Sequence, residues 1–253
     1  MNATSGKYNL RLAVVIWLFG MFGVVPLILL LPSMFAGHQL PVSFLVFSLI
    51  QLLQSGILVA MAAFLGVKLA PKVGLHSPVL EALTNWQPLM LVLRPQVVPG
   101  LIGGVVVGVL LIGMSYVTPH ELTITAQTNL NPWLKVITEV FYGGITEEIL
   151  LRWGIMTLLL WLLWRFIQHN QQSPSSMLIW IAIIGSSLFF AIGHLPAALN
   201  LAGYLTPNII AYVITGNAFG GIVFGFLYQR FGLESAIIAH AGAHIIADIV
   251  SLF

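Results

Sequence analysis

The chain has 253 residues and little charge: 59% of its residues are hydrophobic, 6% are charged, and the net charge is +2. Soluble domains are only about 45–50% apolar and about 25% charged, so an ordinary soluble domain is excluded. No cluster of lysine and arginine offers a nucleic-acid surface, and the lack of cysteine excludes disulfides and thiolate metal sites. Apolar runs of about 20 residues can cross a lipid bilayer. The composition therefore predicts an all-α, polytopic transmembrane helical bundle.

Seven apolar runs predict the membrane spans. They cover residues 10–34, 41–66, 97–117, 133–167, 176–196, 207–229 and 232–252. Between the second and third runs, residues 73–93 are less hydrophobic and contain the helix-start signal Ser77-Pro78. We interpret this stretch as an interfacial helix on the cytoplasmic membrane face, with an ordinary loop as the alternative.

The fourth apolar run is too long for one straight crossing, because its roughly 34 residues would make about 50 Å of helix. The pair Gly143-Gly144 offers a break in it. We expect a short, tilted or re-entrant helix over 132–142 and a spanning helix from about Ile145, which gives seven to eight spans in all. Glu147 and Glu148 would then lie in the first turn of the spanning helix, where the helix dipole favours carboxylates.

The basic residues orient the bundle. With the N-terminus in the cytoplasm and seven crossings, seven of the nine basic residues fall on cytoplasmic segments. These are Lys7, Arg11, Lys68, Lys72, Arg94, Arg165 and Arg230. Lys135 falls at an outer edge, and Arg152 falls within the membrane. The positive-inside rule then predicts an integral membrane protein with a cytoplasmic N-terminus and an extracytoplasmic C-terminus.

Three of the few charged residues stand together in the fourth run: Glu147, Glu148 and Arg152. Ionisable groups at this depth are expensive, so they indicate a functional site by default. Glu148 and Arg152 are four residues apart, in the favoured orientation for an ion pair on a helix. A structural lock is the leading interpretation for Arg152.

Three histidines are expected at the depth of these carboxylates. His194 ends the fifth run, whereas His240 and His244 lie one turn apart on the last run, with Asp248 one turn further. A helix rise of about 1.5 Å per residue places all of them except His240 in the outer half of the membrane. A single buried histidine is usually a satisfied polar group. Two carboxylates, three histidines and an arginine at similar depth are costly to keep for packing alone.

This set of side chains suits a carboxylate that activates water, with imidazoles that hold the water or polarise a carbonyl. There is no cysteine, and no serine stands in a Gly-x-Ser-x-Gly motif. A covalent nucleophile is therefore not expected. We predict an active site between the helices.

At these residues the chain resembles the CPBP family of intramembrane endopeptidases, which includes CAAX proteases and bacteriocin-processing enzymes and is also called Abi. The first motif is Glu147-Glu148-Ile-Leu-Leu-Arg152, and the second is Phe190-Ala-Ile-Gly-His194. The third motif of the family is His-x-x-x-Asn or Asp. It matches His240 followed by His244, and the alternative frame His244-Ile-Ile-Ala-Asp248 fits it literally.

The resemblance spans roughly residues 100–253 and implies an endopeptidase core over 97–253, with membrane helices and an interfacial segment over 1–96. It implies that Glu147 activates water with His194, that Glu148 and Arg152 support the site, and that His240 and His244 stabilise the oxyanion. The substrate would be a membrane-embedded or lipidated protein or peptide, and the membrane the inner membrane of a bacterium or archaeon.

Three histidines and a glutamate would also suit a zinc ion with an open position for water. The candidate ligands are Glu147, His194, His240 and His244. Two other classes of function stay open. One is a non-catalytic immunity or chaperone-like membrane protein of the same fold, and the other is an ion-coupled transporter that uses the same side chains as a relay.

Overall fold

The structure is a computed structural model that describes residues 9–35, 40, 42–125 and 131–251. Lys7, which counted toward the charge bias, and the predicted end of the last span at residue 252 lie outside the described residues. Within the described part, seven helical segments are long and apolar enough to cross a membrane, and no residue is in a strand. The predicted all-α transmembrane bundle is confirmed.

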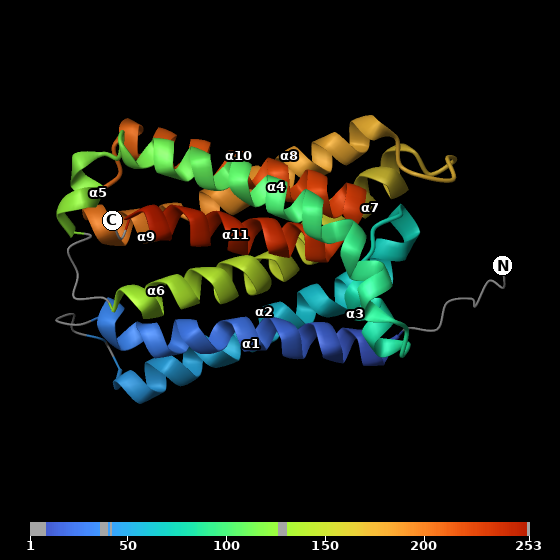
Figure 1. The fold of residues 1–253 in the computed structure, drawn as a ribbon, viewed down its shortest axis with the longest axis horizontal. Coiled ribbons are helices and arrows are strands. Elements are labelled where there is room, and N and C mark those ends of the chain that lie inside the picture. The colour runs from blue at the N-terminus through green and yellow to red at the C-terminus, as the bar shows by residue number, and fades with distance from the viewer. Residues whose placement is uncertain (1–8, 36–39, 41, 126–130, 252–253) are drawn as a thin grey trace.

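The helices run largely along the long axis of the molecule (Figure 1). In chain order they are α1 (Leu10–Met34), α2 (Phe44–Leu69), η1 (Ala70–Val73), α3 (Pro78–Thr84), α4 (Leu89–Ser115), α5 (His120–Thr125), α6 (Pro132–Thr138), η2 (Glu139–Glu147), η3 (Ile149–Met156), α7 (Thr157–Ile167), α8 (Ser176–Gly193), α9 (Leu195–Ala202), α10 (Pro207–Phe231) and α11 (Leu233–Ser251). The short helix α3 lies at one end of the bundle, and α5 and α9 lie at the other (Figure 1).

The third span begins earlier than predicted. Helix α4 starts at Leu89 instead of residue 97 and contains Pro95 and Pro99. Proline inside a helix removes one hydrogen bond but does not always end the helix, and neighbouring helices in a membrane protein compensate for the loss. The predicted interfacial helix over 73–93 is therefore reduced to the seven residues of α3. The rest of that stretch is the turn η1, short connections and the start of α4.

The predicted break at Gly143-Gly144 is wrong. The chain stays helical from Pro132 to Ile167, and η2 and η3 within it are π-helices, whose hydrogen bonds run from residue i to i+5. Glu147 and Glu148 therefore lie in the middle of a long helical segment, away from any first turn. There is no separate re-entrant helix over 132–142.

The two glycines serve close helix packing instead. A Cβ atom on Gly144 would lie 2.8 Å from the Cβ of Ala241 on α11, and one on Gly143 would lie 3.2 Å from Nε2 of His244. The first distance is shorter than real Cβ contacts, and the second would require His244 to shift slightly. The pair therefore lets α11 pack against η2, and this contact brings the last two histidines beside the glutamates.

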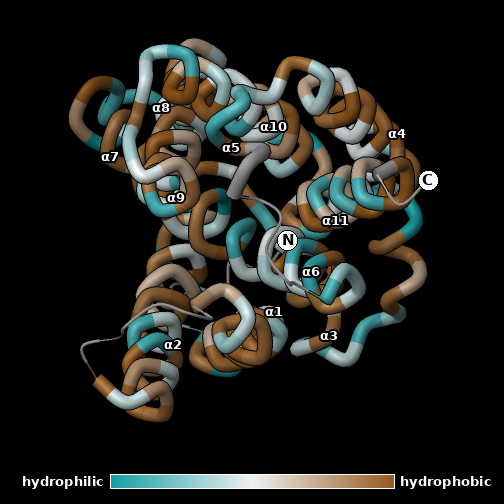
Figure 2. The backbone as a smooth tube through the Cα atoms, turned by 90° about the vertical axis from the view of Figure 1, so that its left-hand side faces the viewer, coloured by the Kyte–Doolittle hydropathy of each residue, from teal (hydrophilic) through white to brown (hydrophobic). Residues whose placement is uncertain are grey.

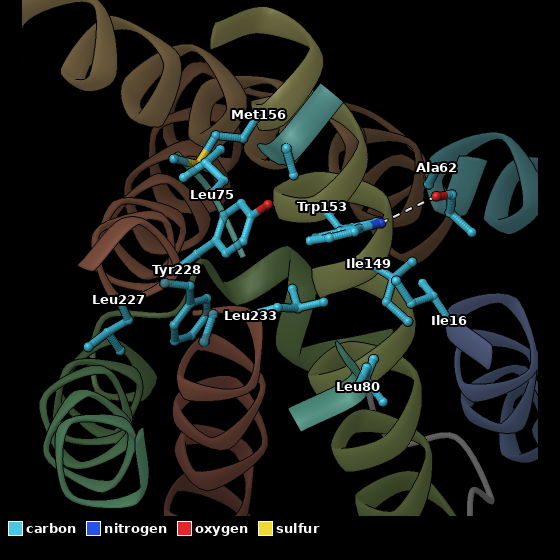
Figure 3. Packing of buried hydrophobic residues seen from close by; sticks show 14 of the residues in the cluster. Ile16, Ala62, Leu75, Leu80, Ile149, Trp153, Met156, Leu227, Tyr228 and Leu233 are labelled. Carbon is cyan, nitrogen blue, oxygen red and sulfur yellow. Dashed lines mark hydrogen bonds between the residues drawn. The ribbon is translucent and has the colours of Figure 1, made fainter. Parts of the chain in front are cut away.

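A buried apolar cluster holds η3 against its neighbours (Figure 3). The indole of Trp153 donates a hydrogen bond of 3.4 Å to the carbonyl of Ala63 on α2. The hydroxyl groups of Thr157 and Tyr228 lie 2.9 Å apart and join α7 to α10. Viewed along the bundle, the outer helices are mainly apolar, whereas hydrophilic residues are visible on α6 and α11 (Figure 2).

Candidate active site

The first motif forms a buried ion pair. Nη1 of Arg152 lies 3.1 Å from Oε1 of Glu148, and the two side chains are 1% and 0% exposed. Nη2 of Arg152 also donates a 3.1 Å hydrogen bond to the carbonyl of Gly221 on α10. The ion pair expected from the four-residue spacing is confirmed, and the hydrogen bond from Arg152 to Gly221 links η3 to α10.

His240 joins this pair from α11. Its Nδ1 lies 2.8 Å from Oε1 of Glu148, and its Nε2 lies 3.9 Å from Oε2 of Glu147. Its ring stacks on Phe224, with the ring centroids 4.5 Å apart. We call Glu148, Arg152 and His240 the buried cluster. The depth arithmetic that placed His240 below the glutamates is wrong, because the glutamates lie in the middle of their helix and not at its end.

Phe190 connects the second motif to the first. Its ring lies 5.0 Å from the guanidinium carbon of Arg152, a distance at which an aromatic face attracts a cation. Its backbone oxygen lies 2.9 Å from Nδ1 of His194. A carbonyl can only accept, so Nδ1 of His194 carries the hydrogen, and in the neutral ring Nε2 keeps a lone pair. The phenylalanine of this motif thus supports the buried cluster and orients the histidine.

One cavity of about 270 Å³ brings the predicted residues together. Four of the six predicted site residues line it: Glu147, His194, His240 and His244. A second pocket of about 140 Å³ also has Glu147 and His194 in its wall. Glu148 and Arg152 are absent from both linings. Glu148 contacts His240, and Arg152 contacts Glu148. The predicted set therefore divides into residues that face the cavity and residues that hold those in place.

The cavity also has polar walls that the sequence analysis did not select: Glu139, Tyr142 and Asn217. Glu139 and His244 belong to a second group of charges, which we call the rim cluster: Lys135, Glu139, His244 and Asp248. Nζ of Lys135 lies 2.8 Å from Oε1 of Glu139 and 2.8 Å from Oδ1 of Asp248. Glu139 is an acid within an apolar run and lies four residues after Lys135. The argument that ionisable groups within a span indicate a functional site, which selected Glu147, therefore also applies to Glu139.

The potential metal ligands in the described part of the chain differ from the predicted zinc set. Glu139, His244 and Asp248 have ligand atoms that all lie within 4.8 Å of one another. This group shares only His244 with the predicted set. It also already has a cationic partner, because Lys135 contacts both of its carboxylates. Zinc bound by Glu147, His194, His240 and His244 stays a prediction.

Comparison with known proteins gives one match. Residues 129–246 match the sequence model of a family described as type II CAAX prenyl endopeptidase Rce1-like. The matched segment contains all six predicted site residues, from Glu147 to His244. It begins within the predicted core of 97–253, whose boundary stays a prediction. No curated protein and no solved structure matches the chain.

Proposed function

Because residues 129–246 match the Rce1-like CAAX endopeptidase model, we propose that this chain is a CAAX protease (CPBP) family member. We propose that it acts as an intramembrane endopeptidase that hydrolyses a peptide bond of a membrane-associated or lipidated substrate. The proposed nucleophile is a water molecule activated by Glu147. The observation that carries this proposal is the shared cavity, whose lining includes Glu147, His194, His240 and His244, with Oε2 of Glu147 3.9 Å from Nε2 of His240. A base, its water and the donors for the developing charge need to lie within hydrogen-bond reach of one another.

In the proposed first step, Glu147 takes a proton from water as the oxygen attacks the substrate carbonyl carbon. His194 holds the same water. Its Nδ1 is engaged by the Phe190 carbonyl, so Nε2 is the nitrogen left for the water. In the second step the C–N bond of the tetrahedral intermediate breaks, and Glu147 returns the proton to the leaving amine. A general base of this kind contributes about 10²- to 10⁴-fold to the rate.

His240 and His244 are the proposed donors for the oxyanion. A Cβ atom on Gly143 would lie 3.2 Å from Nε2 of His244 and 3.4 Å from Nε2 of His240. Both nitrogens therefore approach the small space that this glycine leaves open. His240 donates from Nε2 when its ring carries a hydrogen on both nitrogens. It also does so as a neutral ring with its hydrogen on Nε2, in which case a protonated Glu148 donates a hydrogen bond to Nδ1.

Glu148 and Arg152 have a positioning role in this proposal. The Glu148 carboxylate fixes the His240 ring through Nδ1, and the Arg152 guanidinium supplies the opposite charge 3.1 Å away. A buried carboxylate without a cation would be strongly unfavourable. The pair therefore keeps His240 in one orientation while Glu147 stays available for chemistry.

A cleavage assay tests the proposed function. The purified protein in lipid vesicles is mixed with a peptide that carries a prenylated C-terminal cysteine, and with the same peptide without the lipid. We expect cleavage of the prenylated peptide, located by mass spectrometry, and a loss of about 10²- to 10⁴-fold in Glu147→Gln. Glu81→Gln, on α3 and outside the cavity, is the matched control and should keep full activity. Cleavage by purified Glu147→Gln at the wild-type rate would refute the assignment.

The protein is an integral membrane protein, and we propose that its N-terminus is cytoplasmic and its C-terminus extracytoplasmic, in a bacterial or archaeal inner membrane. The positive-inside rule supports this orientation. Lys68, Lys72 and Arg94 flank α3 on the proposed cytoplasmic side, whereas the connection between α5 and α6 on the proposed outer side has no basic residue. Reporter domains fused after Phe253 and inserted near Asn85 test it. A C-terminal fusion that is active only in the cytoplasm would reverse the orientation.

A further inference from the structure

The chain has an unusual residue in the third motif. In the frame of the motif that begins at His240, His244 stands where the family pattern has Asn or Asp, and its ring reaches further than either side chain. An imidazole has two distinct nitrogens, and the partner of one decides what the other can do. The partner of Nδ1 in His244 therefore matters for any role of Nε2 in the cavity.

That partner is Glu139. Oε2 of Glu139 lies 3.4 Å from Nδ1 of His244, while Nε2 of His244 faces the space beside Gly143 on the cavity wall. The two residues lie 105 positions apart and come from η2 and α11, so the contact depends on the packing of these two helices. His244 and Glu139 are 25% and 30% exposed.

The carboxylate of Glu139 is itself held in place. The ammonium of Lys135 lies 2.8 Å from Oε1 of Glu139 and 2.8 Å from Oδ1 of Asp248. Nζ of Lys135 also donates a 3.0 Å hydrogen bond to Oε2 of Glu139. The ammonium thus holds both oxygens of the carboxylate, and Oε2 lies between Lys135 and the His244 ring. A carboxylate that is fixed by a cation restricts the orientation of a histidine more strongly than a freely rotating carboxylate would.

We propose that Glu139 is a positioning residue for His244: its carboxylate accepts the Nδ1 hydrogen and thereby turns Nε2 into the cavity. A carboxylate facing a ring nitrogen makes that nitrogen the donor. Glu139 then decides which ring edge meets the substrate carbonyl, and Nε2 donates to the oxyanion when the ring carries a hydrogen on both nitrogens. The longer histidine would thus take over the role of the shorter Asn or Asp of the family as a donor to the oxyanion, because Glu139 orients it. This inference rests on the proposed function.

Kinetics in vesicles test the inference with variants at one position. Glu139→Ala should lower kcat about 10- to 100-fold, as is typical for the loss of a residue that orients a functional histidine, and should leave KM within about threefold, because the contact acts in the transition state. Glu139→Gln keeps an accepting oxygen and should restore most of the activity. Glu121→Ala, on α5 and outside the cavity, is the control. Equal losses in Glu139→Ala and Glu139→Gln would mean that only the charge of Glu139 matters, and would overturn the inference.

A double-variant cycle separates positioning from a general structural role. Glutamine at position 244 keeps a nitrogen near Nε2 but has none at Nδ1, so Glu139→Ala should cost less than about twofold in a His244→Gln background. Equal losses in both backgrounds would contradict the inference.

A readout independent of activity covers the case in which His244→Gln is inactive. In protein labelled with ¹⁵N-histidine, the His244 signals, identified by their loss in His244→Gln, should show a hydrogen on Nδ1 and should change in Glu139→Ala. An unchanged spectrum would overturn the inference. The proposed function is judged separately, by cleavage in the wild type and its loss in Glu147→Gln.

Discussion

The two clusters of charged side chains beside the cavity differ chiefly in their access to solvent. In the buried cluster, the side chains of Glu148, Arg152 and His240 are at most 6% exposed. In the rim cluster, exposure ranges from 10% for Asp248 to 42% for Lys135. Similar residue types thus occur in two environments within a few helical turns of each other.

This difference predicts different consequences of breaking each cluster. Charges out of contact with water are strongly destabilising when one partner is removed, because the other remains buried and unpaired. Exposed pairs contribute about 0–1 kcal/mol and weaken with salt. The buried cluster should therefore determine whether the site forms, and the rim cluster should tune a site that is already formed.

The largest loss of stability is expected for Arg152→Met. This change leaves Glu148 buried without its cation and should lower the free energy of unfolding by about 3–5 kcal/mol, with loss of cleavage. Unfolding in mixed detergent micelles measures it. Arg165→Met, at the exposed end of α7, is the matched control and should change stability by less than about 0.5 kcal/mol. Equal effects of the two changes would remove the distinction between the clusters.

A smaller loss of stability is expected for Gly144→Ala, at the contact between α11 and η2. In Gly144→Ala, the added methyl group would lie 2.8 Å from the Cβ of Ala241, so α11 would have to shift. Overpacking of this kind costs about 1–3 kcal/mol, and activity should fall because His240 and His244 move with α11.

The control for this change is Gly113→Ala in α4, where no atom lies within 4 Å of the added carbon. That variant should be neutral or slightly more stable, since alanine favours a helix over glycine. If Gly144→Ala kept full stability and activity, the close approach of α11 would not be needed to form the site.

The smallest effect on stability is expected for Lys135→Met. Lys135 is 42% exposed, so its loss should cost at most about 1 kcal/mol. The difference from the wild type should shrink as salt is added, because exposed charges are screened. The cost of Arg152→Met should not change with salt in this way. A large, salt-independent cost of Lys135→Met would place the rim cluster in the same class as the buried cluster.

The sequence predicted the features that depend on local composition. Apolar runs located the spans, and the rarity of charge made Glu147, Glu148 and Arg152 stand out. The four-residue spacing also predicted the Arg152–Glu148 ion pair. These features were readable because charged groups are exceptional in an apolar helix.

Features that depend on tertiary contacts could not be predicted from the sequence. Gly143-Gly144 resembles a helix break when it is considered alone, and only the approach of Ala241 explains it as a packing contact. The π-helices η2 and η3 have no distinctive composition. The contact of Glu139 with His244 joins two helices whose relative position is set by the whole bundle. The sequence could have identified Glu139 as a candidate site residue, but it could not have identified His244 as its partner.

The central claim is that Glu147 acts as a base on water and not as a nucleophile. A single-turnover cleavage in ¹⁸O-labelled water, with enzyme in excess over the prenylated peptide, tests it most directly. If water attacks the peptide carbonyl, the new carboxyl group of the N-terminal fragment carries the label in the first turnover, and the Glu147 carboxylate does not. An unlabelled product carboxyl group, with the label found in Glu147, would contradict the account.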